Sequence, residues 1–220
     1  MKHILEIKDL NYRYKDAAKD EYVLKNINME FDEAKVYAIK GKSGSGKTTL
    51  LSLISGLEKK YEGTILYNDK ELNKMNLDKY RNTDIGIVFQ SYNLLPTYTA
   101  IENIILSMDI NNIKNIDRKK TALELMEKVG LKKSQKDRRV LKLSGGEQQR
   151  IAIARSLSYN PKIILADEPT GNLDKDTESE ILKIFTDLAH NENKCVIIVT
   201  HSKNVCEKAD KIYELHKRED

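Results

Sequence analysis

The stretch "KVYAIKGKSGSGKTTLLSLISGL", Lys35 to Leu57, decides the fold. It joins a short apolar strand pattern to a leucine-rich helical pattern through a loop that contains three glycines. Gly41 to Thr48 match the spacing G-x-x-x-x-G-K-T, and a strand before it with a helix after it is the context that a phosphate-binding loop requires. Glycines let amide N–H groups turn toward phosphate oxygens, and the helix adds the positive end of its dipole. A plain glycine-rich turn would need neither the lysine nor the threonine.

This loop predicts a nucleoside triphosphate site. Lys47 would lie against the β- and γ-phosphates, where it also serves catalysis, and the Thr48 hydroxyl would bind Mg²⁺. The predicted nucleotide-binding residues of the loop are Gly41, Ser43, Gly44, Ser45, Gly46, Lys47, Thr48 and Thr49.

A second motif, "KIILADEPTGNLD", runs from Lys162 to Asp174. Its apolar residues predict a strand that ends at Asp167, and in a parallel sheet this end faces the ligand crevice. Asp167 would then hold Mg²⁺ through water, and Glu168 would orient and deprotonate the attacking water. A buried structural Asp–Glu pair is the alternative, which the phosphate-binding loop makes the weaker one.

A third motif, "LKLSGGEQQRIAIAR", runs from Leu141 to Arg155. Ser144 and Glu147 have the spacing of a capping box at the start of a helix. A cap alone does not need Gly145 and Gly146, because each glycine weakens a helix by ~1 kcal/mol relative to alanine. The pair indicates that a phosphate approaches the bare amides at this helix end.

Composition narrows the class of protein. Apolar residues make up 40% and charged residues 33% of the 220-residue chain, which is typical of a globular protein. The net charge of +4 is thinly spread, which argues against a nucleic-acid binder. The basic segment 132–139 is a solvated loop or a docking site for a partner. No apolar run approaches the ~20 residues of a membrane span, and the N-terminus lacks the pattern of a signal peptide. The two cysteines do not form a disulfide framework. We therefore expect the protein to be located in the cytoplasm.

Apolar patterns predict strands at 3–14, 27–32, 35–41, 63–68, 85–90, 162–168, 195–201 and 211–217. Helical patterns lie between several of them, including one capped by Asp117 and ended by Gly130. Strands that alternate with helices predict an α/β fold with a parallel sheet. Residues 91–159 contain no convincing strand and are predicted to form a helical insertion.

Together, the phosphate loop, "LSGGEQQR" and "LADEPTGNLD" resemble the nucleotide-binding subunit of ABC transporters over essentially the whole chain. The segments "FQSYNLLPTYTAIEN" and "TGNLD" resemble its MacB, LolD and FtsE-type members, and "KCVIIVTHSKNV" resembles the Vex-type exporter ATPases of streptococci. The resemblance implies a single ABC ATPase domain over 1–220. It would have a RecA-like P-loop NTPase core with an N-terminal antiparallel β subdomain (1–90 and 160–220) and an inserted α-helical subdomain (91–159).

The resemblance also assigns roles to residues outside the loop. Tyr14 would stack on adenine, although Tyr12 competes for this role. Gln90 would contact Mg²⁺ and the water, and His201 would contact the γ-phosphate and orient Glu168.

In the family, the helix end at Ser144, Gly145 and Gly146 meets the γ-phosphate held by the other subunit, and the loop of Asp174 crosses to that subunit. The spacing in the sequence does not distinguish this contact from one within a single chain. Two positions depart from the family pattern: Lys42 stands where proline is frequent, and Ala34 stands where a glycine turn is common.

The resemblance implies a homodimer that closes over two Mg·ATP molecules and powers a separate integral-membrane permease of the MacB, LolC or FtsX kind, by export or mechanotransmission. The chain would lie in the cytoplasm, peripheral at the inner face of the cell membrane. Residues 91–103 would form the docking surface, with core packing the alternative for Leu94 and Leu95. An FtsE-like ATPase that signals without transport stays open. A P-loop kinase would have no reason for "LSGGEQQR", and soluble ABC ATPases of DNA repair or translation carry two cassettes or a coiled coil.

Overall fold

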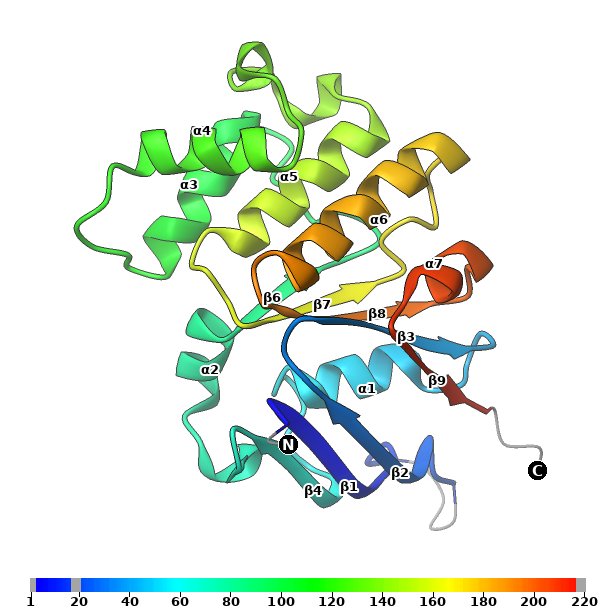
Figure 1. Ribbon diagram of the computed structural model, residues 1–220. Coiled ribbons are helices and arrows are strands. Elements are labelled where there is room, and N and C mark those ends of the chain that lie inside the picture. The colour runs from blue at the N-terminus through cyan, green and yellow to red at the C-terminus, as the bar shows by residue number, and fades with distance from the viewer. Residues whose placement is uncertain (1–2, 17–20, 217–220) are drawn as a thin grey trace.

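A parallel sheet in the order β6-β7-β8-β3-β9 forms the centre of the computed structural model, which describes residues 3–16 and 21–216 (Figure 1). All of its strand pairs are parallel. The strands are β3 (Lys35–Gly41), β6 (Ile85–Val88), β7 (Ile163–Asp167), β8 (Cys195–Thr200) and β9 (Lys211–Leu215). The predicted strand 211–217 is confirmed as far as Leu215, whereas Lys217 lies outside the described residues.

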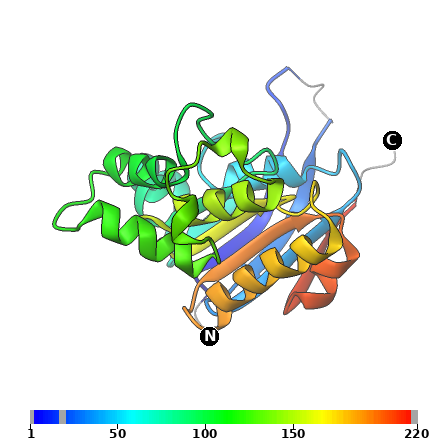
Figure 2. The same ribbon diagram turned by 90° about the horizontal axis from the view of Figure 1, so that it is seen from above.

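Helices cover both faces of this sheet (Figures 1 and 2). Helix α1 (Lys47–Ile54) packs on one face, and α5 (Gly145–Leu157), α6 (Lys175–His190) and α7 (Lys203–Lys208) pack on the other. Alternate side chains of a strand therefore enter different cores: Tyr37 and Ile39 pack on the α1 side, and Val36 and Ala38 pack on the α6 side. Burial on both faces explains why the central strands β7 and β8 are continuous apolar runs.

A smaller antiparallel sheet, in the order β2-β1-β4-β5, lies beyond α1. Its strands are β1 (Leu5–Tyr12), β2 (Leu24–Phe31), β4 (Glu62–Tyr67) and β5 (Lys70–Glu71). The short β5 is not predicted from the sequence. A 3₁₀ turn (Leu72–Lys74) and α2 (Leu77–Thr83) lead back to β6. The apolar face of this sheet shares a hydrophobic core with α1. Because α1 directly follows the phosphate-binding loop, this packing fixes the position of the loop.

Helices fill the chain between β6 and β7, all of which the structure describes. They are α3 (Ala100–Ile110), α4 (Arg118–Lys128), 3₁₀ turns at Lys133–Gln135 and Val140–Lys142, and α5. The predicted ends of α4 are confirmed: the Asp117 side chain accepts the Lys120 N–H at 3.0 Å, and Gly130 has a φ of 78°. Within 89–162, extended pairing outside the sheets is limited to one isolated bridge between Thr99 and Arg139.

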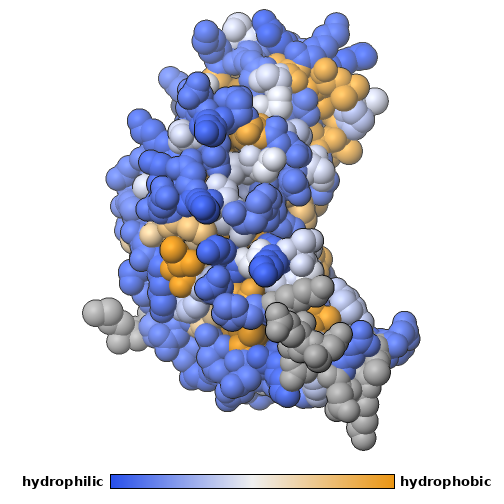
Figure 3. Space-filling view, turned by 90° about the vertical axis from the view of Figure 1, so that its right-hand side faces the viewer, coloured by the Kyte–Doolittle hydropathy of each residue, from blue (hydrophilic) through white to orange (hydrophobic). Residues whose placement is uncertain are grey.

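The parallel arrangement brings the carboxyl ends of four neighbouring strands to one edge. Gly41 ends β3, Gln90 follows β6, Asp167 ends β7 and His201 follows β8. This edge is where ligands bind in open α/β sheets. The space-filling view shows a mostly hydrophilic face with scattered apolar patches (Figure 3). Across residues 3–16 and 21–216, no helix has the length and apolar character needed to cross a bilayer.

Candidate functional site

A cavity of about 830 Å³ lies at the carboxyl edge of the parallel sheet. It is lined by Tyr14, Val23, Lys42, Ser43, Gly44, Gly46, Lys47, Thr48, Thr49, Gln90, Asp167, Glu168 and His201. The fold therefore gathers most of the predicted site residues, which come from segments far apart in the sequence. Gly41 and Ser45 do not line it, because the buried Ser45 side chain packs against Gly41 beneath the loop. Val23 was not predicted, since nothing in its sequence context marks it as a wall of the site.

The phosphate-binding loop adopts the backbone that its glycines allow. Gly44 and Gly46 have φ values of 79° and 88°, in the left-handed region that favours glycine. Gly46 is the N-cap of α1, and no side chain caps this helix end. Its first amides are therefore available to an anion, which the helix dipole also favours. Lys47 extends back along the loop, where its Nζ donates to the carbonyl oxygens of Gly41 at 2.8 Å and Lys42 at 3.1 Å.

Thr48 and Asp167 form the candidate cation site. Thr48 Oγ1 donates to Asp167 Oδ2 at 3.1 Å, and burial is the main cause that raises the pKa of Asp167. A hydroxyl beside a partly desolvated carboxylate suits Mg²⁺, which binds one or two carboxylates together with substrate phosphates. Across the described ranges, no group of three or more His, Cys, Asp or Glu side chains could hold a metal. The Thr48 hydroxyl and the Asp167 carboxylate fit a magnesium ion, for which phosphate and water would supply the other ligands.

Glu168 and His201 face each other across the carboxyl ends of β7 and β8. His201 Nδ1 lies 2.8 Å from Glu168 Oε1, and the His201 backbone N–H donates to Oε2 at 3.3 Å. Glu168 has a φ of 45°, which is uncommon outside glycine, while its N–H donates to Val199 O at 2.9 Å. Such backbone strain clusters at functional sites. The Glu168 side chain is 14% exposed and the His201 side chain is 70% exposed, so the pair joins a nearly buried carboxylate to an imidazole that is open to solvent.

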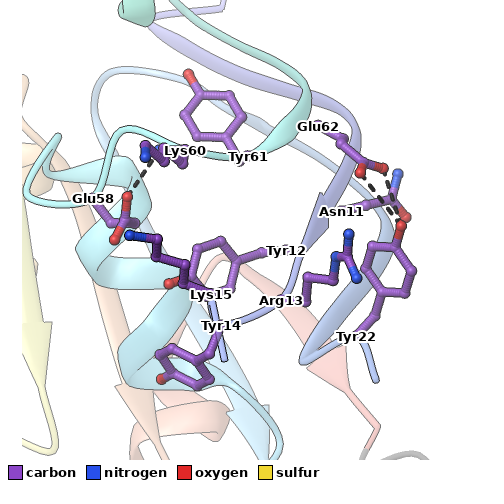
Figure 4. A pocket seen from close by; sticks show the side chains of 10 residues that line it. All are labelled: Asn11, Tyr12, Arg13, Tyr14, Lys15, Tyr22, Glu58, Lys60, Tyr61 and Glu62. Atoms are coloured by element: carbon purple, nitrogen blue, oxygen red, sulfur yellow. Dashed lines mark hydrogen bonds between the residues drawn. The ribbon is translucent and has the colours of Figure 1, made fainter. Parts of the chain in front are cut away.

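The structure distinguishes the two tyrosines that compete for the adenine. Tyr12 is 6% exposed and belongs to the core, whereas Tyr14 is 54% exposed and lines the cavity. Their rings meet edge to face with centroids 5.3 Å apart, and the Tyr14 hydroxyl lies 3.0 Å from Thr49 Oγ1. A second hollow, of about 710 Å³, lies beside them, and both tyrosines contribute to its wall (Figure 4). The accessible aromatic ring at the phosphate-binding loop is thus that of Tyr14.

The start of α5, where Ser144 is the N-cap, is separate from the cavity residues described so far. The predicted capping box is confirmed: Ser144 Oγ accepts the Glu147 N–H at 3.2 Å, and Glu147 Oε2 accepts the Ser144 N–H at 2.7 Å. Ser144, Gly145 and Gly146 do not line the 830 Å³ cavity. Packing within the chain also favours glycine at position 146, because a Cβ there would lie 2.5 Å from Thr177 Cγ2.

Asp174 is likewise outside the cavity and forms the N-cap of α6. Its carboxylate accepts the N–H groups of Asp176 at 3.1 Å and Thr177 at 3.0 Å. These bonds, above all that from Thr177, lower the pKa of Asp174. Its side chain is exposed.

Comparison with known proteins identifies the family. The family model for ABC transporters matches residues 24–171. YclH of Bacillus subtilis, an uncharacterized ABC transporter ATP-binding protein, is 45% identical over 207 residues, which cover 94% of this chain and 91% of YclH. The lipoprotein-releasing system ATP-binding protein LolD of Francisella tularensis is 38% identical over 218 residues, which cover 96% of this chain and 93% of LolD.

Solved structures of MJ0796 from Methanocaldococcus jannaschii have the same fold. A dimeric structure of this ABC transporter cassette has a TM-score of 0.86 and 38% identity, covering 96% of this chain and 94% of that chain. A second dimeric structure, of a post-hydrolysis state bound to ADP and Pi, has the same TM-score and 37% identity. The family model covers more than half of the chain and the relatives match nearly all of it. The chain therefore belongs to the ABC transporter family, as an ATP-binding subunit that hydrolyses ATP.

Proposed function

We propose that two copies of this chain close over two Mg·ATP molecules, reopen after hydrolysis, and drive a separate integral-membrane permease. One observation carries the proposal. The start of α1 at Lys47 and the start of α5 at Ser144 are both helix N-termini, which favour phosphate, yet Ser144 lies outside the cavity that contains Lys47. A second copy brings the two together. The dimeric structures of the relative MJ0796 support this arrangement.

Nucleotide binding is assigned to the residues around the 830 Å³ cavity. The Tyr14 ring stacks on the adenine, and Lys47 and the amides of residues 43–49 hold the phosphates. Thr48, Asp167 and Gln90 would hold Mg²⁺, which neutralises the phosphate oxygens when it is bound. Lys42 lines the cavity and adds a second cation near the phosphates.

Hydrolysis is assigned to Glu168 and His201. The Glu168 carboxylate accepts a proton from a water molecule as the water oxygen attacks the γ-phosphorus. The bond between the γ-phosphorus and the β–γ bridging oxygen then breaks. The imidazole and backbone N–H of His201 keep both carboxylate oxygens in place. ADP and phosphate are the products.

Closure requires that ATP bind the closed dimer more tightly than the open one, because a ligand shifts an equilibrium only by its differential affinity. A γ-phosphate held between Lys47 of one subunit and Ser144 of the partner subunit supplies this difference. Hydrolysis removes it. Asp174 is exposed and would cross to the partner subunit. Residues 91–159 act as a helical arm on the core formed by 1–90 and 160–220.

The permease would dock on the segment after Gln90. Leu95 and Tyr98 are 41% and 37% exposed, while Leu94 packs against the core. The buried Asn103 accepts the Leu95 N–H at 2.8 Å and so fixes the segment to α3. Docking there would hold the chain at the inner face of the cell membrane through a MacB-, LolC- or FtsX-like permease, and the relative named for a lipoprotein-releasing system supports this proposal.

Purification of the tagged chain from membranes of its native host tests this proposal. We expect an integral-membrane permease to co-purify with the wild type and with Leu57→Asp, and to be lost with Leu95→Asp. Leu57 is a matched control because it is a 58% exposed leucine after α1. A wild-type preparation without any membrane partner would contradict the permease proposal. A complex that hydrolyses ATP but moves no cargo would point to the FtsE-like signalling role.

A further inference from the structure

Glu178 accepts two side-chain hydrogen bonds beside the catalytic pair. Its Oε1 receives the Ser202 hydroxyl at 2.8 Å and the Thr170 hydroxyl at 3.2 Å. Glu178 lies in the first turn of α6, and its N–H donates to Asp174 O at 2.8 Å. One carboxylate oxygen thus joins three segments of the chain: the β7–α6 loop, the start of α6 and the β8–α7 loop.

The two donors flank the residues assigned to hydrolysis. Thr170 is two residues after Glu168, and Ser202 directly follows His201. Ser202 is held further by its N–H, which donates to the hydroxyl of the buried Thr200 at 2.9 Å, and by its role as N-cap of α7. Any shift of Glu178 would therefore move both loops that present Glu168 and His201 to each other.

We propose that Glu178 is a positioning residue that fixes the distance between Glu168 and His201, an inference that rests on the proposed role of this pair. One oxygen that accepts both hydroxyls holds the two loops together, and partial burial strengthens such hydrogen bonds. Thr170 is 5% exposed, so removing its acceptor would leave a buried hydroxyl unsatisfied and the loop free to rearrange. Glu178 does not line the 830 Å³ cavity, so it would act through the two loops.

The experiment compares steady-state ATP hydrolysis by Glu178→Ala, Glu178→Gln and a control, Glu124→Ala, an exposed helical carboxylate on α4. We expect Glu178→Ala to lower kcat on the order of tenfold, the scale of one or two lost positioning hydrogen bonds, with little change in KM for ATP. Glu178→Gln should recover most of the activity, because an amide oxygen accepts the same two hydroxyls. A residue that only supports the fold would change KM and thermal stability together with kcat.

A double-mutant comparison makes the test specific. If Glu178 acts through the Glu168–His201 pair, Glu178→Ala added to His201→Ala should slow hydrolysis little beyond His201→Ala alone. Should Glu178→Ala fail to fold, Ser202→Ala and Thr170→Val each remove one donor and test the same contacts.

Four results overturn the inference: Glu178→Ala as active as the control, a glutamine variant as slow as the alanine variant, losses that multiply in the double mutant, or KM and thermal stability that change together with kcat. These are distinguishable from failure of the proposed catalytic pair. If Glu168→Gln and His201→Ala hydrolyse ATP at the wild-type rate, the roles of the pair fail. If they are slow while Glu178→Ala is not, only the positioning role fails.

Discussion

The Thr48 hydroxyl donates a hydrogen bond of 3.1 Å to the Asp167 carboxylate, joining the first turn of α1 to the end of β7 across 119 positions of the sequence. This contact ties the phosphate-binding loop to the strand that ends at Asp167, directly before Glu168, the proposed general base. Burial opposes the charge of Asp167 and raises its pKa above the ordinary value of 3.8, although the hydrogen bond from Thr48 acts in the opposite direction.

We predict that Asp167→Asn stabilises the nucleotide-free protein. Above pH 3.8 the folded state binds more protons at Asp167 than the unfolded chain does, so the free energy of unfolding falls as pH rises through the raised pKa. The asparagine variant carries no charge at this position, so its free energy of unfolding does not fall in this way. Its advantage over the wild type should be present at about pH 7 and shrink toward about pH 4, as measured by urea unfolding. Asp137→Asn, in an exposed loop, is the control, and a less stable Asp167→Asn at neutral pH would contradict the prediction.

Glu168→Gln should bind ATP and dimerise but hydrolyse it at least ~10²-fold more slowly, the usual scale for losing a general base. The amide keeps the size of the side chain and can still accept from His201. Gel filtration with Mg·ATP measures the dimer, and a phosphate-release assay measures turnover. Undiminished turnover would reject Glu168 as the base.

Ser144→Arg should leave ATP binding by the monomer intact while preventing the ATP-dependent dimer. The side chain lies outside the cavity of Lys47, so a bulky cation there obstructs a second subunit and not the subunit's own nucleotide. Nucleotide titration and gel filtration of Ser144→Arg in the Glu168→Gln background separate the two effects. Ser134→Arg, in an exposed 3₁₀ turn, is the control, and a dimer that still forms with Ser144→Arg would refute the contact between subunits.

Tyr14→Ala should weaken ATP binding by about tenfold, because aromatic contacts contribute about 0.5–1.5 kcal/mol beyond the area they bury. Tyr14→Phe should bind ATP nearly as well as the wild type, since the ring and not the hydroxyl makes the contact. Titration calorimetry with ATP measures the difference. Equal affinity for wild type and Tyr14→Ala would show that adenine is held elsewhere.

Ala34→Gly should stabilise the turn between β2 and β3. Ala34 has a φ of 59°, a left-handed conformation that is strained for alanine and free of strain for glycine. We expect the free energy of unfolding to rise by about 0.5–1 kcal/mol, after allowing for the greater entropy of glycine in the unfolded chain. Urea unfolding should show a higher midpoint with an unchanged slope. Ala34→Ser keeps the strain and should show no gain.

Local patterns in the sequence predicted much of the fold. The strand–loop–helix run through Lys47 is continuous, so the phosphate-binding loop is identified by spacing alone. The capping groups of Asp117 and Ser144 act within one helical turn, and both contacts are present as expected. The eight predicted strands appear near their expected places. The strands β3, β7 and β8 are buried on both faces and therefore apolar almost throughout, whereas β1 and β2 mix buried and exposed residues.

The sequence by itself therefore determined which segments are strands, caps and phosphate-binding turns, since those features depend on neighbours within a few residues. Only the tertiary structure decided that Tyr14 and not Tyr12 faces the nucleotide cavity, that Leu94 is packed while Leu95 is exposed, and that Ser144 lies away from Lys47. It alone brought Glu178 to Thr170 and Ser202. These relations depend on how segments far apart in the chain pack against one another, and no local periodicity encodes that packing.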